Sequence, residues 1–269
     1  MNPKVSIIMG VYNCESTVKE SIDSIINQTF NDWEFIICDD GSTDKTYRLV
    51  EEYVNRYKNK IILIKNTNNK GLAYSLNRCF KIAKGEYIAR QDGDDLSLIN
   101  RLEEEVKFLD TNEECVLVST GIKLFDENNI WNGFMPKEYP DNIDVINCRA
   151  FVHASAMIRK NILQEVNGYR VSKETLRNED FDLWSRIYSL NLKGANILKR
   201  LYYVREDLNA YKRRKFKYRI DEFKLRKKYF KVLNISLKYY PIIFKPIIIG
   251  LIPRRVLLII KRCMNIELI

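Results

Sequence analysis

Hydrophobic and polar positions follow two alternating patterns over the first hundred residues. Short continuous apolar runs predict four buried strands, at residues 5–9, 33–38, 61–64 and 87–89. Between these runs, apolar residues recur at helical spacing and predict three helices, over residues 16–27, 44–57 and 73–83. Strands that alternate with helices in this way are typical of a parallel α/β sheet. The pattern therefore predicts a Rossmann-like, doubly wound half with helices on both faces of the sheet.

Sheets of this kind bind ligands beyond the carboxyl ends of their strands. In this chain mostly polar or acidic residues follow each predicted strand, at positions 12–13, 39–42, 66–71 and 92–95. The first of these turns contains only one glycine, Gly10, so the dinucleotide-binding fingerprint is absent, and no phosphate-binding P-loop motif occurs in the chain. The sequence thus disfavours a nicotinamide dehydrogenase and a P-loop NTPase.

The run Asp92-Gly93-Asp94-Asp95 is the most acidic of these strand ends. Neighbouring carboxylates repel one another and raise each other's pKa unless a cation lies between them. Oxygen ligands in a loop favour Mg²⁺ or Mn²⁺, which usually also bind substrate phosphates. An alternative interpretation is that Asp94 and Asp95 only cap the next helix, whose first turn favours acidic residues.

Two further acidic clusters leave similar alternatives open. Asp39-Asp40-Gly41-Ser42-Thr43-Asp44 offers a carboxylate that could accept hydrogen bonds from a base or ribose, or it is an ordinary turn with a helix cap. The segment 178–184 opens a predicted helix, where acidic residues favour the helix dipole without any function.

Six segments in this order resemble the inverting family 2 glycosyltransferases with the GT-A fold, over roughly residues 3–205. Gly10 stands where the family usually has a proline. The matching segments are residues 5–13, 39–44, the 69–71 turn with Asn77, 85–95 with the D-x-D metal motif, 153–159, and 179–184 with the E-D motif of the catalytic base.

This resemblance implies a role for each matching position. Tyr12 would pack against the base of a nucleotide-diphosphate sugar, and Asp40 would hydrogen-bond that base. Asp92 would lie near the ribose and the metal, and Asp94, together with Asp95, would bind Mn²⁺ or Mg²⁺. Asp180 would be the general base. Further substrate or nucleotide contacts are expected at Val11, Asn13, Gly71, Asn77, Arg90, His153, Glu179 and Trp184.

These roles are chemically consistent with one another. A divalent cation stabilises the departing nucleoside diphosphate, and a carboxylate on the opposite side removes the proton of the acceptor hydroxyl. One base without a protein nucleophile implies a single displacement with inversion. The chain lacks the Q-x-x-R-W motif and the transmembrane bundle of the polymerising branch of the family, which favours transfer of one sugar per acceptor.

His153 is the only histidine of the chain. A lone histidine is more often a packed or surface residue than a ligand. Its match to the family's His-x-Ser segment leaves a place beside the diphosphate or the acceptor equally open, without a role as base.

Composition and charge add information about partners. The 269 residues are 46% hydrophobic and 30% charged, enough apolar content for a large core. The six cysteines form no C-x-x-C pair and no signal peptide precedes the first strand, so we expect a cytosolic protein with reduced thiols. Residues 1–198 carry 25 basic and 30 acidic side chains, whereas residues 199–269 carry 20 and 5. This basic tail indicates an anionic partner, either phospholipid or nucleic acid.

The apolar content of the tail favours the lipid. A basic amphipathic helix is predicted over residues 212–237, with an apolar stripe formed by Phe216, Ile220, Phe223, Phe230, Leu233 and Leu237. The alternative is a helix packed on the catalytic domain with a solvated basic face. The apolar runs at 239–253 and 256–260 are too short and too often interrupted to span a bilayer. We therefore expect peripheral attachment to an anionic membrane surface through residues 212–262, and no nucleic-acid binding.

The sequence thus predicts a GT-A domain over residues 1–205, with a nucleotide-sugar half at about 1–100 and an acceptor half at about 101–205, followed by a helical membrane-associating tail over 206–269. The expected function is metal-dependent, inverting transfer of one sugar, of the hexosyltransferase type, from a UDP-sugar to a lipid-linked saccharide. Capsule, exopolysaccharide or lipopolysaccharide synthesis at the cytoplasmic face of the membrane is the pathway that the resemblance implies.

Two rival functions remain open at this point. A GT-A-like nucleotidyltransferase would also need a metal and acidic strand ends, although its usual glycine-rich, basic N-terminal loop is missing. A non-catalytic membrane or nucleic-acid binding module on a degenerate scaffold is the second rival, and the intact set Asp40, Asp92, Asp94 and Asp180 speaks against it.

Overall fold

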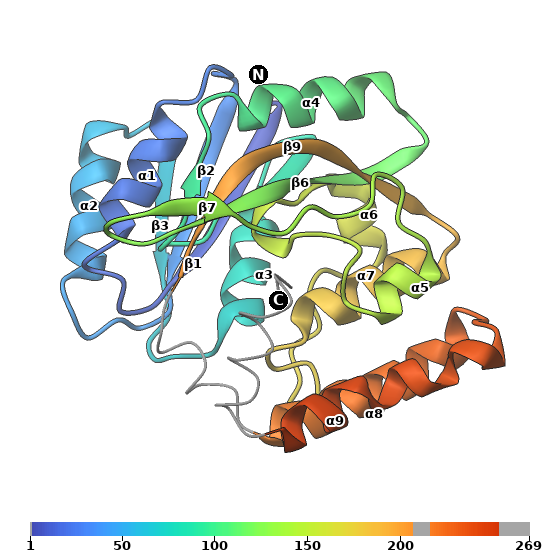
Figure 1. Cartoon of the computed structure of the whole chain (residues 1–269). Helices are drawn as coiled ribbons and strands as arrows, with labels where there is room; N and C mark the ends of the chain where they lie inside the picture. The colour runs from blue at the N-terminus through green and yellow to red at the C-terminus, as the bar shows by residue number, and fades with distance from the viewer. Residues whose placement is uncertain (1, 207–215, 253–269) are drawn as a thin grey trace.

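The computed structural model describes residues 2–206 and 216–252, which form a mixed sheet with helices on both faces (Figure 1). The strand order is β3-β2-β1-β4-β8-β6-β9-β5, and β7 pairs with β6. The strands are β1 (Val5–Val11), β2 (Trp33–Asp39), β3 (Ile61–Lys65), β4 (Tyr87–Arg90), β5 (Leu96–Ser97), β6 (Cys115–Phe125), β7 (Ile130–Asn132), β8 (Met157–Arg159) and β9 (Lys193–Arg205). The α-helices are α1 (Val18–Ile26), α2 (Thr46–Arg56), α3 (Leu72–Ile82), α4 (Arg101–Thr111), α5 (Asn142–Ile146), α6 (Lys160–Glu165), α7 (Glu179–Ser189), α8 (Phe216–Val232) and α9 (Lys245–Leu251). Two 3-10 helices are η1 (His153–Ser155) and η3 (Leu237–Phe244).

The N-terminal half is the parallel α/β unit that the hydrophobic pattern predicts. Strands β3, β2, β1 and β4 are parallel neighbours. All seven predicted elements are present, and their ends differ from the prediction by at most two residues. Alternate residues of β1 face opposite layers: Ile7 and Met9 pack with α1, α2 and α4, whereas Ile8 packs with α3 and α7. The sheet is therefore buried on both faces, which explains its continuous apolar runs.

The second half departs from the doubly wound pattern. The short strand β8 lies antiparallel between β4 and β6. Strand β6 then pairs in parallel with the long β9, with shifts of register near Thr120 and Gly121. The sheet is thus mixed rather than continuously parallel. This arrangement brings α7, which follows β8 and α6 in the chain, to the same side of the sheet as α3.

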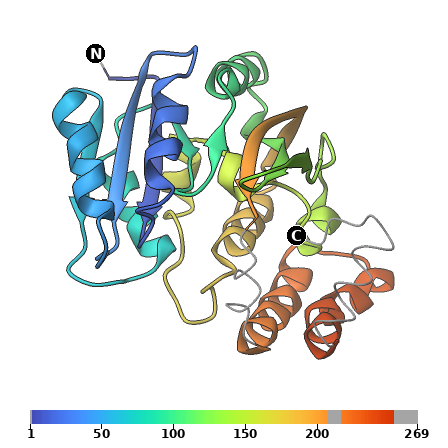
Figure 2. The ribbon, with the colours of Figure 1, turned by 60° about the vertical axis from the view of Figure 1, so that its left-hand side comes forward.

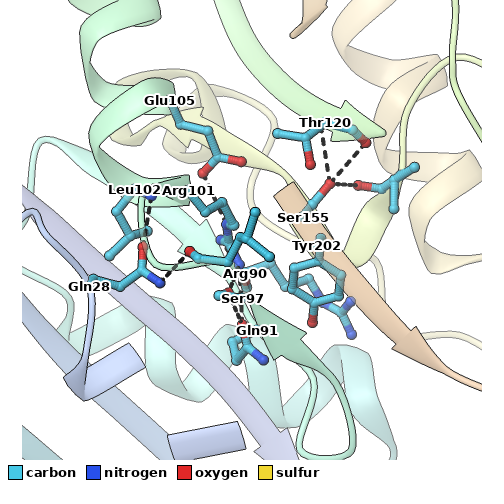
Figure 3. A network of polar contacts seen from close by, with 12 residues as sticks. Gln28, Arg90, Gln91, Ser97, Arg101, Leu102, Glu105, Thr120, Ser155 and Tyr202 are labelled. Carbon is cyan, nitrogen blue, oxygen red and sulfur yellow. Dashed lines mark hydrogen bonds and ion pairs between the residues drawn. The ribbon is translucent and has the colours of Figure 1, made fainter. Parts of the chain in front are cut away.

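A buried polar network fastens the turn that follows β4 (Figure 3). Arg101, at the start of α4, is fully buried and donates hydrogen bonds to Gln91 Oε1 (3.1 Å), Ser97 Oγ (2.7 Å) and the carbonyl of Arg90 (2.7 Å). Its Nε forms an ion pair with Glu105 one turn further along α4 (3.2 Å). Gln91 in turn donates to the carbonyls of Asp92 and Asp95. Arg101 is therefore connected, through one side chain, to both ends of the acidic turn, residues 92–95.

The basic tail packs on the catalytic domain. Helix α8 lies beneath α7 and α5, with α9 beside it in both views (Figures 1 and 2). Tyr229 of α8 donates a 2.6 Å hydrogen bond to Asp182 of α7. Arg226 contacts Glu222 and the Cys148 thiol. The packed helix that the sequence left open as an alternative is thus present in the structure.

The apolar stripe predicted for this helix is divided between buried and exposed side chains. Phe230 and Leu233 are buried, but Phe216, Ile220 and Leu237 are exposed, the last by 79%. The polar contacts of Tyr229 and Arg226 turn another face inward, which also buries Leu225. Residues 212–215 of the predicted helix and the apolar run at 256–260 lie outside the described residues.

Among residues 2–206 and 216–252, no helix is both long enough and apolar enough to span a membrane. In the described part of the tail, the apolar stretches form two short helices, η3 and α9. This agrees with the sequence, in which the apolar runs are short and interrupted.

We predict that Arg101→Met lowers the free energy of unfolding by about 3–5 kcal/mol, because it leaves the Glu105 carboxylate and several acceptors buried without their donor. Urea unfolding at pH 7 measures this change. Arg48→Met is the matched control, because the Arg48 side chain is 82% exposed, and it should change stability by less than about 0.5 kcal/mol. A loss below about 1 kcal/mol in Arg101→Met would contradict the role of the network.

Candidate functional site

The polar clusters predicted from the strand ends meet at one edge of the sheet. Because β3, β2, β1 and β4 are parallel, their carboxyl ends lie side by side. Val11, buried at the end of β1, pairs with Asp39 at the end of β2, and Asp39 pairs with Lys65 at the end of β3. Tyr12 follows Val11 and is 43% exposed. This edge provides the first wall of the site.

Asp40 holds the loop before α3. Its Oδ1 accepts hydrogen bonds from the Asn66 amide (2.6 Å) and the Lys70 backbone N–H (2.9 Å), and its Oδ2 accepts from the Gly71 N–H (2.8 Å). Gly71 has a φ of +91° and directly precedes α3, a conformation that favours glycine. Both oxygens of Asp40 are therefore used within the protein, although the residue also lines the cavity described below.

Asp39 differs from Asp40 because only one of its two carboxylate oxygens has a hydrogen-bond partner among the described residues. Its Oδ1 accepts from the backbone N–H groups of Gly41 and Ser42, but its Oδ2 is buried with no hydrogen-bond partner among the described residues. A buried acceptor without a partner costs free energy. This carboxylate is a candidate base contact that the sequence analysis missed in favour of Asp40, because neither the burial nor the partners of the two residues can be read from a D-D pair.

Asn13 is fastened to the same region. It has a φ of +52°, its backbone N–H donates to Ser42 Oγ (3.0 Å), and its Oδ1 accepts from the Thr43 N–H (2.9 Å). Asp44 accepts from the N–H of Thr46, the first residue of α2. Residues 39–44 thus contain the ordinary turn that the sequence left open as an alternative. They also carry Oδ2 of Asp39, which has no hydrogen-bond partner among the described residues.

The acidic turn at the end of β4 is held by a second guanidinium. Arg90 is buried and binds both oxygens of Asp92, at 2.6 and 3.1 Å. The charge of Asp92 helps to hold the pKa of Arg90 above its ordinary value. Asp94 is exposed, and Asp95 is buried with its Oδ1 accepting from the Arg205 N–H. Helix α4 begins only at Arg101, with β5 in between, so the alternative that Asp94 and Asp95 cap that helix is wrong.

These residues are chemically suited to a divalent cation. Burial, together with the charges of Asp94 and Asp92, raises the pKa of Asp95 well above its ordinary value, as expected for carboxylates grouped without a cation. Within residues 2–206 and 216–252, no three His, Cys, Asp or Glu side chains are grouped so as to hold a metal by themselves. Mg²⁺ in phosphate sites commonly takes one or two carboxylates and completes its shell with phosphate oxygens and water. The acidic turn fits that pattern rather than an all-protein cage.

Glu179 and Asp180 open α7, as the sequence predicts. Burial and the neighbouring charge of Asp180 raise the pKa of Glu179 to about 7. Burial also raises the pKa of Asp180, while the Phe181 N–H (2.7 Å) and Arg90 oppose the increase. A carboxylate with a raised pKa is a better proton acceptor than an ordinary Asp. Glu179 lines the cavity directly.

His153 lies in an aromatic corner near these acids. Its Nε2 is 2.9 Å from the Tyr169 hydroxyl, and its ring packs edge-on against Trp184, which is buried. Burial, followed by the charge of Arg90, lowers the pKa of His153 well below its ordinary value. The ring is therefore neutral at physiological pH and acts as a hydrogen-bonding partner of Tyr169.

Asn77 holds the same corner from α3. Its Nδ2 donates to the Tyr169 carbonyl (2.7 Å), and its Oδ1 accepts from the Tyr169 N–H (2.8 Å). A Cβ on Gly168, whose φ is +62°, would lie 2.6 Å from Asn77 Oδ1, so only glycine fits there. The amide of Asn77 is thus bonded to the backbone, and its expected substrate contact stays a prediction.

A cavity of about 670 Å³ joins the two halves, a size typical of small-ligand sites. Its first wall contains Tyr12, Asp40 and Gly71, and its second wall consists of the loop before α7 together with Glu179 and Tyr218 of α8. Burial raises the pKa of Tyr169; the charge of Arg90 opposes this increase, and the charges of Glu179, Asp180 and Asp92 add to it. The structure thus brings together the acidic turn and the α7 acids, which are far apart in sequence.

Known proteins match this chain in sequence and fold. The family model described as Glycosyl transferase family 2 matches residues 6–166. EpsE of Bacillus subtilis, itself assigned as a glycosyltransferase, is 43% identical over 255 residues, covering 95% of this chain and 92% of EpsE. The Escherichia coli UDP-Glc:alpha-D-GlcNAc-diphosphoundecaprenol beta-1,3-glucosyltransferase WfaP is 32% identical over 194 residues, covering 71% of this chain and 73% of WfaP.

Solved glycosyltransferases share the fold. Staphylococcus aureus TarS 1–349 in complex with UDP-GlcNAc superposes with a TM-score of 0.70 at 19% identity, covering 90% of this chain and 73% of that one. The Pyrobaculum calidifontis mannosyltransferase PcManGT in complex with GDP-Man and Mn²⁺ gives a TM-score of 0.64 at 18% identity, covering 98% and 81%. The mixed sheet with its flanking helices is therefore of the GT-A type, and this chain is an enzyme that belongs to glycosyl transferase family 2.

Proposed function

We propose that this enzyme transfers a single sugar, with inversion, from a UDP-sugar to a lipid-linked saccharide during bacterial polysaccharide synthesis. The observation that carries the proposal is that the acidic turn and the two half-buried acids that open α7 both lie near Arg90, which binds Asp92 and affects the pKa of Glu179 and Asp180. The activity for which WfaP is named, on a GlcNAc-diphosphoundecaprenol acceptor, supports the donor and acceptor classes. Capsule, exopolysaccharide and lipopolysaccharide are the products that such acceptors serve.

The donor base is assigned to the first wall. Tyr12 offers an exposed ring there, and Asp39 offers an unpartnered carboxylate oxygen to the N3–H of uracil. Asp40, the base contact expected from the resemblance, instead fixes the loop at Gly71. The proposal therefore gives Asp39 the hydrogen bond to the base and gives Asp40 the task of shaping the pocket.

The donor diphosphate is assigned to the acidic turn. Asp94 and Asp92 would hold Mn²⁺ or Mg²⁺, which neutralises charge on the departing nucleoside diphosphate. Arg90 orients Asp92, and the hydrogen bonds of Arg101 and Gln91 hold the turn in place. These residues fix where the charge of the leaving group can develop.

The acceptor is assigned to the α7 side. Asp180 accepts the proton of the acceptor hydroxyl as that oxygen attacks the anomeric carbon, and the bond to the diphosphate breaks on the opposite face. Glu179, directly on the cavity, contacts the acceptor or the transferred sugar. His153, Tyr169 and Trp184 support this region as a neutral packed corner.

We further propose that the enzyme works at the cytoplasmic face of the membrane, attached peripherally through its tail. Leu237, Phe244, Ile248 and Leu251 are exposed on η3 and α9, and α8, which contacts both elements, carries five lysines. Exposed apolar side chains among basic ones favour an anionic lipid surface.

The proposed reaction predicts metal-dependent release of a nucleoside diphosphate. Purified enzyme is incubated with a panel of nucleotide sugars, Mn²⁺ and membrane extract, with and without EDTA. Release from one donor that EDTA abolishes is expected. Release of pyrophosphate from a nucleoside triphosphate and a sugar phosphate would instead identify a nucleotidyltransferase.

Asp180→Asn should lower kcat by about 10²–10⁴-fold, because the general base is lost. The matched variant Glu179→Gln should retain activity within about tenfold. In the wild type, kcat/KM should fall as the pH drops through the raised pKa of Asp180, since protonation removes the base. If Glu179→Gln loses as much activity as Asp180→Asn and abolishes this acid limb, the base is Glu179.

Asp39→Asn should exchange an acceptor for a donor at the base. The amide introduced there would keep its oxygen on the Gly41 and Ser42 N–H groups and turn its NH₂ toward N3 of the base. We expect UDP to bind about tenfold more weakly and CDP, whose N3 is an acceptor, to gain relative to UDP. Calorimetric titration of both nucleotides measures the change; an unaltered UDP/CDP ratio would place the base elsewhere.

Sedimentation with vesicles tests the membrane proposal. The full chain should bind vesicles containing phosphatidylglycerol and not those of phosphatidylcholine alone, and Leu237→Asp/Leu251→Asp should weaken this binding by about tenfold or more. Equal binding to both kinds of vesicle, or none to either, would refute an electrostatic attachment.

A further inference from the structure

The second wall of the cavity carries cations that the proposed donor site does not use. The loop before α7 (residues 170–178) contributes Arg170, Lys173 and Arg177 to the lining. We propose that these cations bind the diphosphate of the lipid-linked acceptor, and that apolar side chains between them hold the first part of its lipid chain. This inference rests on the proposed function and names the acceptor subsite.

The charge of this wall favours an anion. Its three cations face two lining carboxylates, Asp40 and Glu179. Asp40 is already satisfied by three hydrogen bonds, and the pKa of Glu179 is raised to about 7, so its charge at neutral pH is incomplete. Guanidinium and ammonium groups are the usual protein partners of phosphate oxygens.

The donor diphosphate has its own site. None of Asp92, Asp94 and Asp95 lines this cavity, and the cation assigned to them would neutralise the donor phosphates. Lys173 and Arg177 are therefore left for a second anionic group, and Arg170, which pairs with Asp182, adds its charge beside them. In a transfer between a nucleotide sugar and a lipid-linked saccharide, that group is the diphosphate of the acceptor.

Apolar side chains alternate with these cations. Val171 and Leu176 line the same cavity and are 53% and 45% exposed, and Tyr74 lies across from them on α3. Tyr218 of α8 also lines the cavity, and Phe216 and Ile220, two residues before and after it in the chain, are exposed. Exposed apolar groups beside phosphate-binding cations match an amphiphile with an anionic head. The continuation onto α8 leads from the cavity to the tail that we assign to the membrane.

The loop is held in place before any ligand binds. Arg170 Nη1 pairs with the fully buried Asp182 (3.0 Å), which also accepts from Tyr229 of α8. Thr175 is buried and donates to the Arg170 carbonyl (2.7 Å), and Arg177 has a φ of +67°. Such fixed geometry lowers the cost of binding. Asp182 thus joins the subsite to the tail helix.

Farnesyl diphosphate tests the subsite, because it combines a diphosphate with a short isoprenoid chain. We would titrate it calorimetrically into the full chain saturated with UDP, with equal Mg²⁺ in both solutions, and compare it with inorganic diphosphate. Lys173→Gln/Arg177→Gln should weaken farnesyl diphosphate binding by about 10- to 100-fold. Lys58→Gln/Lys107→Gln removes two exposed charges outside the cavity and should change nothing.

A second pair of variants tests the apolar part. Val171→Ser/Leu176→Ser should weaken farnesyl diphosphate by about tenfold and leave inorganic diphosphate unchanged. Equal affinity for the two probes in the wild type would overturn the lipid contact.

Displacement of farnesyl diphosphate by UDP, or an unchanged affinity in Lys173→Gln/Arg177→Gln, would overturn the subsite as a whole. The affinity for UDP, measured on the same protein, separates this result from the proposed function. Normal UDP binding without farnesyl diphosphate binding rejects the subsite alone, whereas absent UDP binding rejects the proposed donor.

Discussion

The site depends on one buried guanidinium, that of Arg101. It bonds to the carbonyl of Arg90, to Gln91 and to Ser97, and so fixes the chain on both sides of the acidic turn. The carboxylates of the acidic turn repel one another, and without the hydrogen bonds of Arg101 they would separate. The ring of Tyr202 lies over Arg101 at 5.2 Å, and its hydroxyl accepts the Asp92 N–H. The long strand β9 is thereby tied to the same turn. A fully buried charge is costly to retain, and here it positions the residues that we assign to the donor diphosphate.

The parts of the fold that depend on local periodicity could be predicted from the sequence. Strands β1 to β4 and helices α1 to α3 are buried on regular faces, so their apolar positions repeat. The three-residue strand β8 carries no such repeat, and its antiparallel pairing depends on contacts with β4 and β6. Arg101 could not be identified either, because a charged residue at the start of a helix is usually exposed. Its burial follows from acceptors distant in the fold.

The same reasoning explains which parts of the candidate site the sequence could bring together. The strand-end rule located Tyr12, Asp39 and Asp92 because topology alone brings parallel strand ends together. It could not distinguish Asp39 from Asp40, since only the hydrogen-bond partners separate them. In the tail, periodicity predicted an apolar stripe that includes Phe216 and Ile220; these two side chains are exposed, and the pairing of Tyr229 with Asp182 turns another face inward. Specific polar contacts determine which face of α8 packs on the domain. These contacts cannot be predicted from the spacing of apolar residues.

Arg101 and Asp182 each stabilise one side of the site. Arg101 fastens the donor side, and Asp182 fastens the loop and the tail helix on the acceptor side. The cavity lies where these two parts meet, with Tyr12 on one wall and Glu179 on the other. An acceptor held by the second wall would present its hydroxyl between Asp180 and the donor sugar, which is the geometry that a single displacement requires.

A crystal structure of the enzyme with a UDP-sugar and Mn²⁺ tests this account most directly. We expect the uracil beside Tyr12 and Asp39, the diphosphate and metal on the acidic turn, and the sugar directed toward Asp180, with the 170–178 loop free of donor phosphate. A donor diphosphate bound by Lys173 and Arg177, away from the acidic turn, would contradict it.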